Sequence, residues 1–128
     1  PSSYLLECSV TFAPGTNAAG IMFRAHHKLS ACYSLRLEPV WHRVVLERWE
    51  LTPRKNRTTI LAERPLTTIP GKSVSVQLFV DGDIIEAFID GRSALCGRGY
   101  DFQSGESGLF VENGEATFSQ VHLRQLPV

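Results

Sequence analysis

Charged and aromatic side chains share one side of several predicted strands, and their types suit carbohydrate recognition. Guanidinium and carboxylate groups can hydrogen-bond two neighbouring hydroxyls at once, and an indole offers an apolar platform to the C–H face of a sugar. A solvated sheet face with cross-strand ion pairs explains the same residue types, so both interpretations stay open. Trp41, in the loop 39–42, is a second candidate platform, or it packs under the edge of the fold. Alternation places on this side Arg24, Arg36, Glu38, Glu47, Trp49, Glu86 and Phe88.

Motifs for catalysis and metal binding are missing. The sequence has no G-x-S-x-G, no H-E-x-x-H and no glycine-rich phosphate loop. Carboxylates are plentiful, but a glycosidase needs two of them facing each other across a cleft, a distance that sequence does not give. His26 and His27 point to opposite faces of a strand, and a tight turn accounts for Asp81-Gly82-Asp83 without calcium. We therefore expect no catalytic residue, no metal and no cofactor.

The sequence pattern predicts that the segments carrying these side chains are β-strands along the whole chain. Apolar residues recur with a period of two and turn residues follow every eight to twelve positions, a pattern typical of an antiparallel sandwich. We predict an all-β fold, a two-sheet antiparallel β-sandwich of the lectin-like jelly-roll kind. Asn113-Gly114 predicts a hairpin between the last two strands, and the polar segment 52–57 predicts a loop. The predicted strands are 4–13, 19–26, 31–38, 43–51, 58–64, 73–80, 84–90, 93–97, 107–112 and 115–126.

The turn at 81–83 fixes which side chains of two strands face the core. A three-residue loop would place Leu78 opposite Glu86, which pairs a core residue with a carboxylate. A two-residue Gly82-Asp83 turn instead pairs Val80 with Ile85, Leu78 with Ala87 and Val76 with Ile89. We choose the second register. It leaves Phe79, Glu86 and Phe88 on the outer face, where two phenylalanines suggest that a loop, a partner domain or a ligand covers them.

Composition and charge narrow the classes of partner. The chain has 128 residues, which fits one domain over 1–128, and 43% hydrophobic with 20% charged residues excludes a disordered or membrane protein. Thirteen basic and thirteen acidic residues give no net charge, so neither nucleic acid nor anionic lipid is an expected partner. The chain begins at Pro1 without methionine or leader, and we interpret it as a fragment of a longer protein.

The cysteines point to buried thiols. Cys8, Cys32 and Cys96 are an odd number, without a C-x-x-C pair, and each lies in or beside an apolar strand. We expect all three to be buried and reduced; one disulfide with a spare thiol is the alternative. Reduced thiols favour a cytoplasmic parent protein slightly over a secreted one.

Residues 73–126 carry a family resemblance. Val76–Arg92 (VQLFVDGDIIEAFIDGR), Ala94–Tyr100 (ALCGRGY) and Gly108–Phe118 (GLFVENGEATF) together resemble the C-terminal β-sandwich module of glycoside hydrolase family 32, which includes invertases, inulinases and levanases. The likeness is weaker over 4–50, and Asp90-Gly91 and Cys96-Gly97 depart from the pattern. The positions that fill the pattern are Glu86, Phe88, Gly91, Arg92, Arg98, Tyr100, Gly108, Leu109 and Gly114.

The resemblance implies an accessory role. The catalytic carboxylates of the family lie on an N-terminal propeller, and the first two of their three motifs have no counterpart here, while Glu7-Cys8 matches the third by letters only. The chain should therefore be noncatalytic and support the propeller of a parent that cleaves β-fructosides such as sucrose or fructan, with retention. Phe79 and Phe88 would then pack on the propeller or a loop, and Glu86 with Arg98 would pair structurally.

Two further functions stay open. The sandwich also looks like carbohydrate-binding module family 66, which grips terminal fructose; in that case Arg24, Arg36, Glu86 and a tryptophan would hold a fructosyl unit, with an affinity of about −4 to −8 kcal/mol. A lectin-like interaction domain unrelated to fructans is the third possibility. The candidate sugar-binding residues are Arg24, Arg36, Glu38, Trp49, Glu86 and Arg98.

Overall fold

The computed structural model describes residues 3–26, 31–51, 56–69, 71–100, 102 and 105–126; for residues 51, 56 and 57 it describes the backbone alone. Within these residues the chain forms ten strands and no helix, which confirms the all-β prediction. Each predicted strand is present, with ends shifted by at most two residues. The strands are β1 (Ser3–Phe12), β2 (Ala18–Ala25), β3 (Ala31–Glu38), β4 (Arg43–Leu51), β5 (Asn56–Pro65), β6 (Val74–Asp81), β7 (Ile84–Ile89), β8 (Ser93–Arg98), β9 (Glu106–Glu112) and β10 (Ala116–Gln125).

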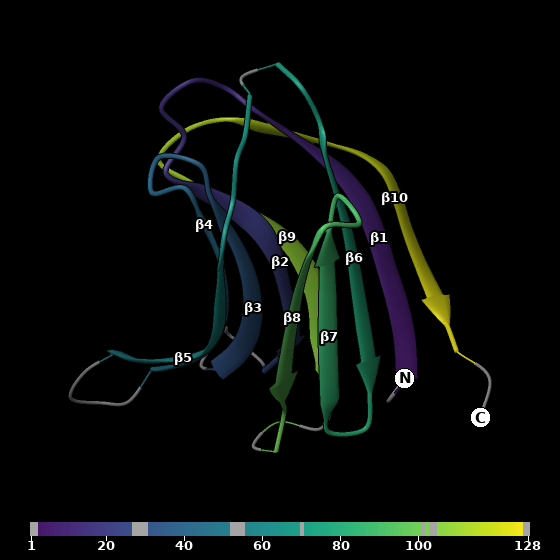
Figure 1. Cartoon of the computed structure of the whole chain (residues 1–128). Coiled ribbons are helices and arrows are strands. Elements are labelled where there is room, and N and C mark those ends of the chain that lie inside the picture. Colours follow the sequence, from purple (N-terminus) through teal and green to yellow (C-terminus); the bar gives the residue numbers. More distant parts are fainter. Residues whose placement is uncertain are drawn as a thin grey trace.

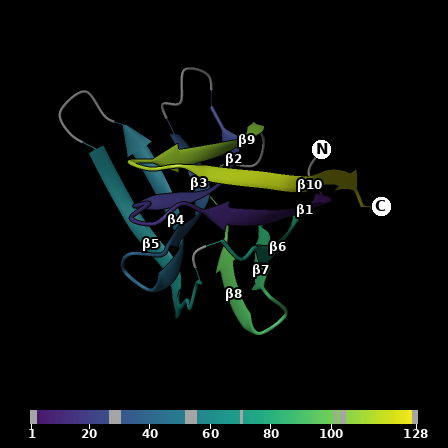
Figure 2. The ribbon, with the colours of Figure 1, turned by 90° about the horizontal axis from the view of Figure 1, so that it is seen from above.

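The strands form two antiparallel sheets of five strands each (Figure 1). Sheet A has the order β10-β1-β6-β7-β8 and sheet B the order β5-β4-β3-β2-β9. Strands β2 to β5 follow one another within sheet B and β6 to β8 within sheet A, so the chain crosses between the sheets after β1, β5, β8 and β9. The start of β1 pairs with the end of β10, so the first and last strands of the described residues lie side by side (Figures 1 and 2).

The core lies between the sheets because alternate residues of each strand point inward. In β6 and β7 every second side chain is buried, as the period-two pattern predicts. Leu78 and Ile85 from sheet A meet Leu35 and Leu46 from sheet B in one apolar cluster. No helix in the described residues is long and apolar enough to cross a membrane. Of the predicted loop 52–57, residues 56 and 57 belong to β5, and 52–55 lie outside the described residues.

The predicted register of the β6–β7 hairpin is confirmed. Val80 pairs with Ile85 and Leu78 with Ala87, which leaves Gly82 and Asp83 as the two turn residues. Gly82 has a φ of 60°, as the first central position of a type II′ turn requires. Glu86 therefore pairs with Phe79 on the outer face of sheet A.

The predicted hairpin at Asn113-Gly114 is wrong. Strand β9 pairs with β2 in sheet B, whereas β10 pairs with β1 in sheet A, so residues 113–115 form a corner between the sheets. This corner packs on the β1–β2 corner through Thr16, whose buried hydroxyl donates to the carbonyl of Ala13 at 2.7 Å and contacts the carbonyl of Glu115 at 2.9 Å. A Cβ on Gly114 would lie 2.6 Å from Thr16 Cα, so the close approach of the two corners explains the glycine.

The prediction for Cys96 is also wrong, and the structure decides between the two alternatives for Trp41. Cys8 and Cys32 are free and buried as expected, but the free thiol of Cys96 is exposed because Cys96 lies on the outer face of β8. Trp41 is 67% exposed, so it does not pack under the edge of the sandwich. Residue His27 lies outside the described residues.

Candidate functional site

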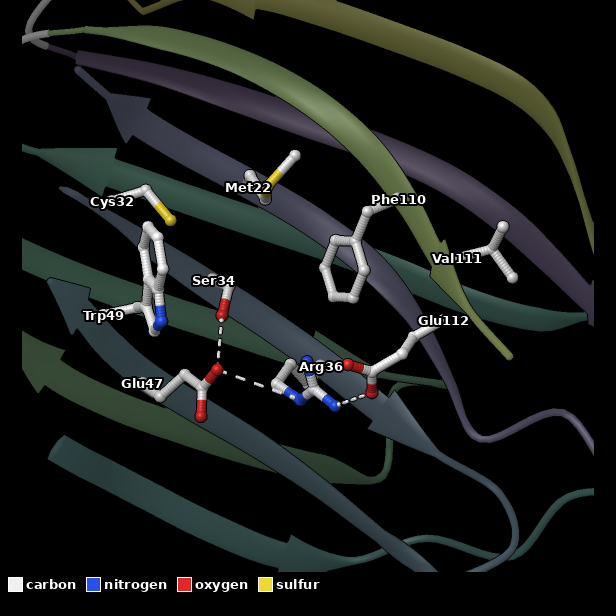
Figure 3. A pocket seen from close by; sticks show the side chains of 9 residues that line it. All are labelled: Met22, Cys32, Ser34, Arg36, Glu47, Trp49, Phe110, Val111 and Glu112. Atoms are coloured by element: carbon white, nitrogen blue, oxygen red, sulfur yellow. Dashed lines mark hydrogen bonds and ion pairs between the residues drawn. The ribbon is translucent and has the colours of Figure 1, made fainter. Parts of the chain in front are cut away.

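A shallow hollow of about 300 Å³ lies on the outer face of sheet B (Figure 3). Its walls come from β2, β3, β4 and β9, four neighbouring strands. Arg36, Glu47 and Trp49, three of the residues that alternation places outside, converge there. The lining residues are Met22, Cys32, Ser34, Arg36, Glu47, Trp49, Phe110, Val111 and Glu112.

Small residues make the floor of this face shallow. Gly20 pairs with Arg36 on one side and with Phe110 on the other. A Cβ built on Gly20 would lie 1.9 Å from the carbonyl oxygen of Leu35, so no larger residue fits without moving the backbone. Ser34, which pairs with Glu47 on β4, keeps the centre of the hollow low. The close approach of β2 to β3 beneath this face therefore requires glycine at position 20.

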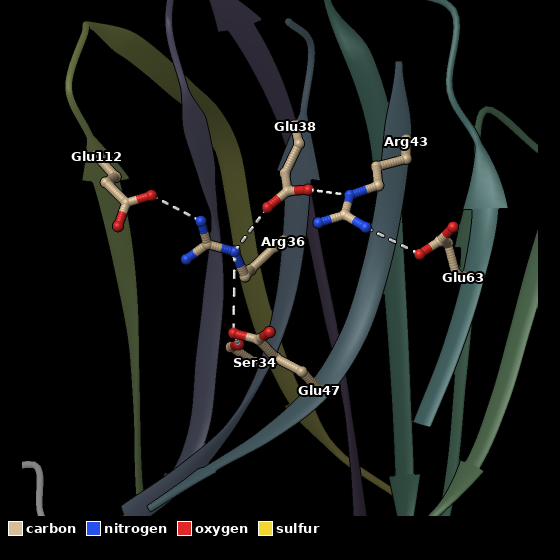
Figure 4. Close-up of polar contacts among 7 residues, drawn as sticks. All are labelled: Ser34, Arg36, Glu38, Arg43, Glu47, Glu63 and Glu112. Carbon is tan, nitrogen blue, oxygen red and sulfur yellow. Dashed lines mark hydrogen bonds and ion pairs between the residues drawn. The ribbon is translucent and has the colours of Figure 1, made fainter. Parts of the chain in front are cut away.

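Arg36 is the centre of an ion-pair network across the strands (Figure 4). Its Nε lies 3.1 Å from Glu38 Oε2 and 3.8 Å from Glu47 Oε1, and its Nη2 lies 2.6 Å from Glu112 Oε2. Ser34 Oγ donates to Glu47 Oε1 at 3.1 Å. Carboxylates from three strands therefore fix the plane of one guanidinium group.

Glu38 connects this network to a second arginine. Its Oε1 accepts from Arg43 Nε and its Oε2 from Arg36 Nε, so both carboxylate oxygens are used inside the protein. Arg43 Nη1 continues to Glu63 Oε2 at 3.0 Å. Because Glu38 is buried and does not line the hollow, its role is to position Arg36.

Two polar atoms at the hollow remain available for a ligand. Arg36 Nη1 is engaged by none of the other described residues, and the same holds for Glu47 Oε2. One is a donor and the other an acceptor, from neighbouring strands β3 and β4. Trp49, half-buried, lies two residues from Glu47 on the same face of β4. A donor, an acceptor and an indole thus surround one space.

The charges of the network affect each other. Burial raises the pKa of Glu47, and the nearby Glu38 and Glu112 raise it further, although Arg36 and the Ser34 hydroxyl act in the opposite direction. For Arg36, burial acts to lower the pKa, but hydrogen bonds to Glu112 and Glu38 and the charges of Glu112 and Glu47 outweigh it, so the pKa is raised. Arg36 is therefore a permanent cation, and burial makes the Glu47 carboxylate easier to protonate than an ordinary glutamate.

The predicted site residues do not all come together. Arg36 and Trp49 line the hollow, with Glu38 buried beside it. Glu86 and Arg98 lie on β7 and β8 in sheet A, on the opposite side of the sandwich, and Arg98 ion-pairs with Asp83 at 3.5 Å. The six residues therefore do not form one site.

Arg24 corrects the prediction most clearly. Instead of projecting outward, it is 1% exposed, and its guanidinium donates to the carbonyl oxygens of Gly82 and, at 3.1 Å, Phe102. The reason is a bulge in the β2–β9 ladder between Met22 and Ala25, where Arg24 has a φ of 49°. The bulge reverses the alternation, so Arg24 joins the two sheets from inside.

Phe110 and Glu112 were missed as site residues, as were Met22, Cys32 and Ser34. Alternation in 107–112 does place Phe110 and Glu112 on the opposite face from Leu109, which is itself 38% exposed, so the face was readable from the sequence. The signal that misled was Asn113-Gly114, because a hairpin there would have kept this strand away from Arg36. The Arg36 Cζ lies 5.6 Å from the centre of the Phe110 ring.

Solved structures show where this fold recurs. The carbohydrate-binding module CBM66 from Bacillus subtilis superposes with a TM-score of 0.83 at 20% identity, covering 98% of this chain and 76% of that one. A fructosyltransferase from A. japonicus gives a TM-score of 0.69 at 11% identity, over 97% of this chain but 22% of the enzyme. The galectin LEC-6 from Caenorhabditis elegans gives a TM-score of 0.66 at 13% identity, covering 97% of this chain and 81% of the galectin. At these identities the likeness shows the β-sandwich fold.

A comparison with curated protein sequences gave no match. The family comparison is decisive, because residues 1–125 match the family described as glycosyl hydrolases family 32 C terminal. This match covers nearly the whole chain, including residues 4–50, where the motif resemblance was weak. The chain therefore belongs to the C-terminal domain family of the family 32 glycoside hydrolases.

Proposed function

We propose that this chain is the noncatalytic accessory module of a β-fructosidase and that the hollow around Arg36 binds a fructosyl unit of a sucrose- or fructan-type sugar. The observation that carries the proposal is the combination of Arg36 Nη1, Glu47 Oε2 and the Trp49 indole around one hollow. Adjacent sugar hydroxyls both donate and accept hydrogen bonds, so a donor next to an acceptor suits them. The apolar face of the ring would lie on the indole.

The charge of the network favours an uncharged ligand. Two arginines, Arg36 and Arg43, stand against four glutamates, Glu38, Glu47, Glu63 and Glu112, which gives a formal charge of −2 when all are ionised. A phosphorylated or carboxylated sugar would meet net repulsion. Neutral fructosides fit this field, and the network already holds Arg36 in place, which lowers the entropy lost on binding.

The parent protein follows from the family. A C-terminal module of family 32 implies attachment to a catalytic domain, and the fructosyltransferase in which this fold makes up 22% of the chain supports that arrangement. We propose a catalytic propeller as this partner and β-fructoside cleavage as its reaction. A hydrolysis assay of this chain alone on sucrose is expected to show no turnover, and measurable turnover would refute the noncatalytic role.

A purely structural role is the second candidate, and the outer face of sheet A favours it. Phe79 and Phe88 are half-buried there and pack edge to face, with ring centres 5.9 Å apart. Two aromatic rings beside Glu86 on a sheet face suit contact with another domain. In this case Glu86 and the Arg98–Asp83 pair would border a domain contact, and the hollow on sheet B would bind nothing.

Titration calorimetry of the chain with levan, inulin and sucrose separates the two candidates. Saturating heat that is lost in Trp49→Ala but kept in Trp41→Ala, a matched control in an exposed loop, is the expected result. Loss in Glu86→Ala with retention in Trp49→Ala would move the site to sheet A. The absence of heat with every sugar would contradict sugar binding and leave the structural role.

A further inference from the structure

We propose that the hollow binds a stretch of more than one sugar unit, which runs across the strands from Trp49 to Phe110. This inference rests on the proposed sugar binding and adds the length of the ligand to it. Trp49 belongs to β4, one end of the four strands that line the hollow, and Phe110 to β9, the other end. Figure 3 shows the two rings on opposite sides of Ser34.

The pairing of the strands gives the scale of this separation. From β4 to β9 there are three strand spacings, which amount to about 14 Å. Trp49 pairs with Cys32, whereas Phe110 shares a row with Gly20 and Arg36, so the two rings are also offset by four residues, or about 13 Å, along the strands. Both residues line the same hollow, and their positions on the sheet are farther apart than the width of one sugar ring.

The groups between the two rings are those that a second sugar unit needs. Arg36 belongs to β3, which lies between the strands that carry the two rings. Its Nη1 is not used in the ion-pair network, and its Cζ lies 5.6 Å from the centre of the Phe110 ring. Half-buried Met22 adds apolar surface next to Phe110. Gly20, which has no side chain, lies between Arg36 and Phe110 in the same row of the sheet. One unit would therefore lie on Trp49 beside Glu47, and the next would lie toward Phe110.

The test is a series of calorimetric titrations with fructose and with linear β-linked fructose oligomers of two and three units. For the native chain we expect the association constant to rise at least fivefold between the single unit and the longest oligomer. Phe110→Leu, which keeps apolar volume but removes the flat ring, is expected to abolish this rise, so that all lengths bind with similar affinity. Trp49→Ala is expected to weaken binding at every length.

Phe79→Leu, the same substitution on the outer face of sheet A, serves as the matched control and should keep the full rise. Circular dichroism of both leucine variants checks that they fold. Equal affinity at all lengths, or a rise that persists in Phe110→Leu, would overturn this inference while the proposed function stands. Failure of the native chain to bind any oligomer would overturn both.

Discussion

Gly20 has a single acceptable residue type, because its neighbours on the sheet leave no space for a side chain. A Cβ there would overlap the carbonyl oxygen of Leu35, which is backbone and does not rotate away. Gly20→Ala is expected to lower the free energy of unfolding by about 2 to 3 kcal/mol, as overpacking of a close-packed region does. Urea denaturation measures this. Gly108→Ala, on the neighbouring strand with open space around the added methyl group, should change stability by about 0.5 kcal/mol or less. Similar losses in both variants would contradict the steric argument.

Glu47 should make stability depend on pH in an unusual direction for a carboxylate. Burial raises its pKa, so the folded state favours the protonated form. The contribution of protonated Glu47 to the free energy of unfolding is fully present at pH values below the ordinary glutamate pKa. It is lost as the pH rises through the raised pKa of the folded state. Glu47→Gln is neutral at every pH and is therefore expected to gain stability relative to the native chain as the pH rises above about 4, the ordinary glutamate range. Urea unfolding across this range tests it, with exposed Glu63→Gln as control. If the stability advantage of Glu47→Gln over the native chain became smaller as the pH rises, the pKa of Glu47 would not be raised by folding.

Single side chains were predictable where alternation holds and unpredictable where it breaks. Arg36 and Trp49 follow the period of two and lie on the predicted outer face. Arg24 lies next to a bulge, and one residue with positive φ turned a predicted ligand into an internal support. No local pattern in Gly20–Ala25 marks that bulge, because its cause is the pairing with β9, a strand more than eighty residues away.

One buried hydroxyl group adds to the backbone hydrogen bonds that join the β1–β2 corner to the β9–β10 corner. Thr16 Oγ1 contacts the carbonyls of Ala13 and Glu115 and accepts from the Glu115 amide at 3.2 Å, all in a fully buried position. Thr16→Val keeps the shape but removes the acceptor of the buried Glu115 amide, while the carbonyls of Ala13 and Glu115 keep their backbone donors. The substitution is expected to cost about 1 to 3 kcal/mol of unfolding free energy. Thr16→Ser keeps the hydroxyl and should lose about 1 kcal/mol for the methyl group. Valine as stable as the native chain in urea denaturation would contradict this role.

The same corners show what a turn motif does and does not predict. Gly82-Asp83 and Asn113-Gly114 are both strong hairpin signals, yet only the first joins two paired strands. At 81–83 the apolar patterns of both flanking strands agree on one register, so pattern and turn reinforce each other. At Asn113-Gly114 the glycine is required by the neighbouring Thr16. A short connection fixes a change of direction, whereas the partner strand is chosen by packing.

The arrangement of the strands into sheets decided which predicted residues share a site. Arg36, Glu38 and Trp49 are on strands of sheet B, and Glu86 and Arg98 are on strands of sheet A. Alternation shows only that a side chain points away from the core, and a sandwich has two such sides. The motif resemblance favoured Glu86 and Arg98, whereas six of the nine residues that line the hollow lie in 4–50, where that resemblance was weak, and three lie in 108–118.

Two separate outer faces predict a specific pattern of energetic coupling. Phe79 and Phe88 pack edge to face on sheet A, at an interplanar angle of 86°. A double-mutant cycle with Phe79→Ala and Phe88→Ala, measured by urea unfolding, should give a coupling of about 0.5 to 1.5 kcal/mol. The control cycle pairs Phe79→Ala with Trp49→Ala, on opposite faces of the sandwich, and should be additive within about 0.5 kcal/mol. If the coupling between Phe79 and Trp49 were as large as that between the two phenylalanines, the two outer faces would be energetically linked. The calorimetric comparison of Trp49→Ala with Glu86→Ala would then no longer show which face binds the sugar.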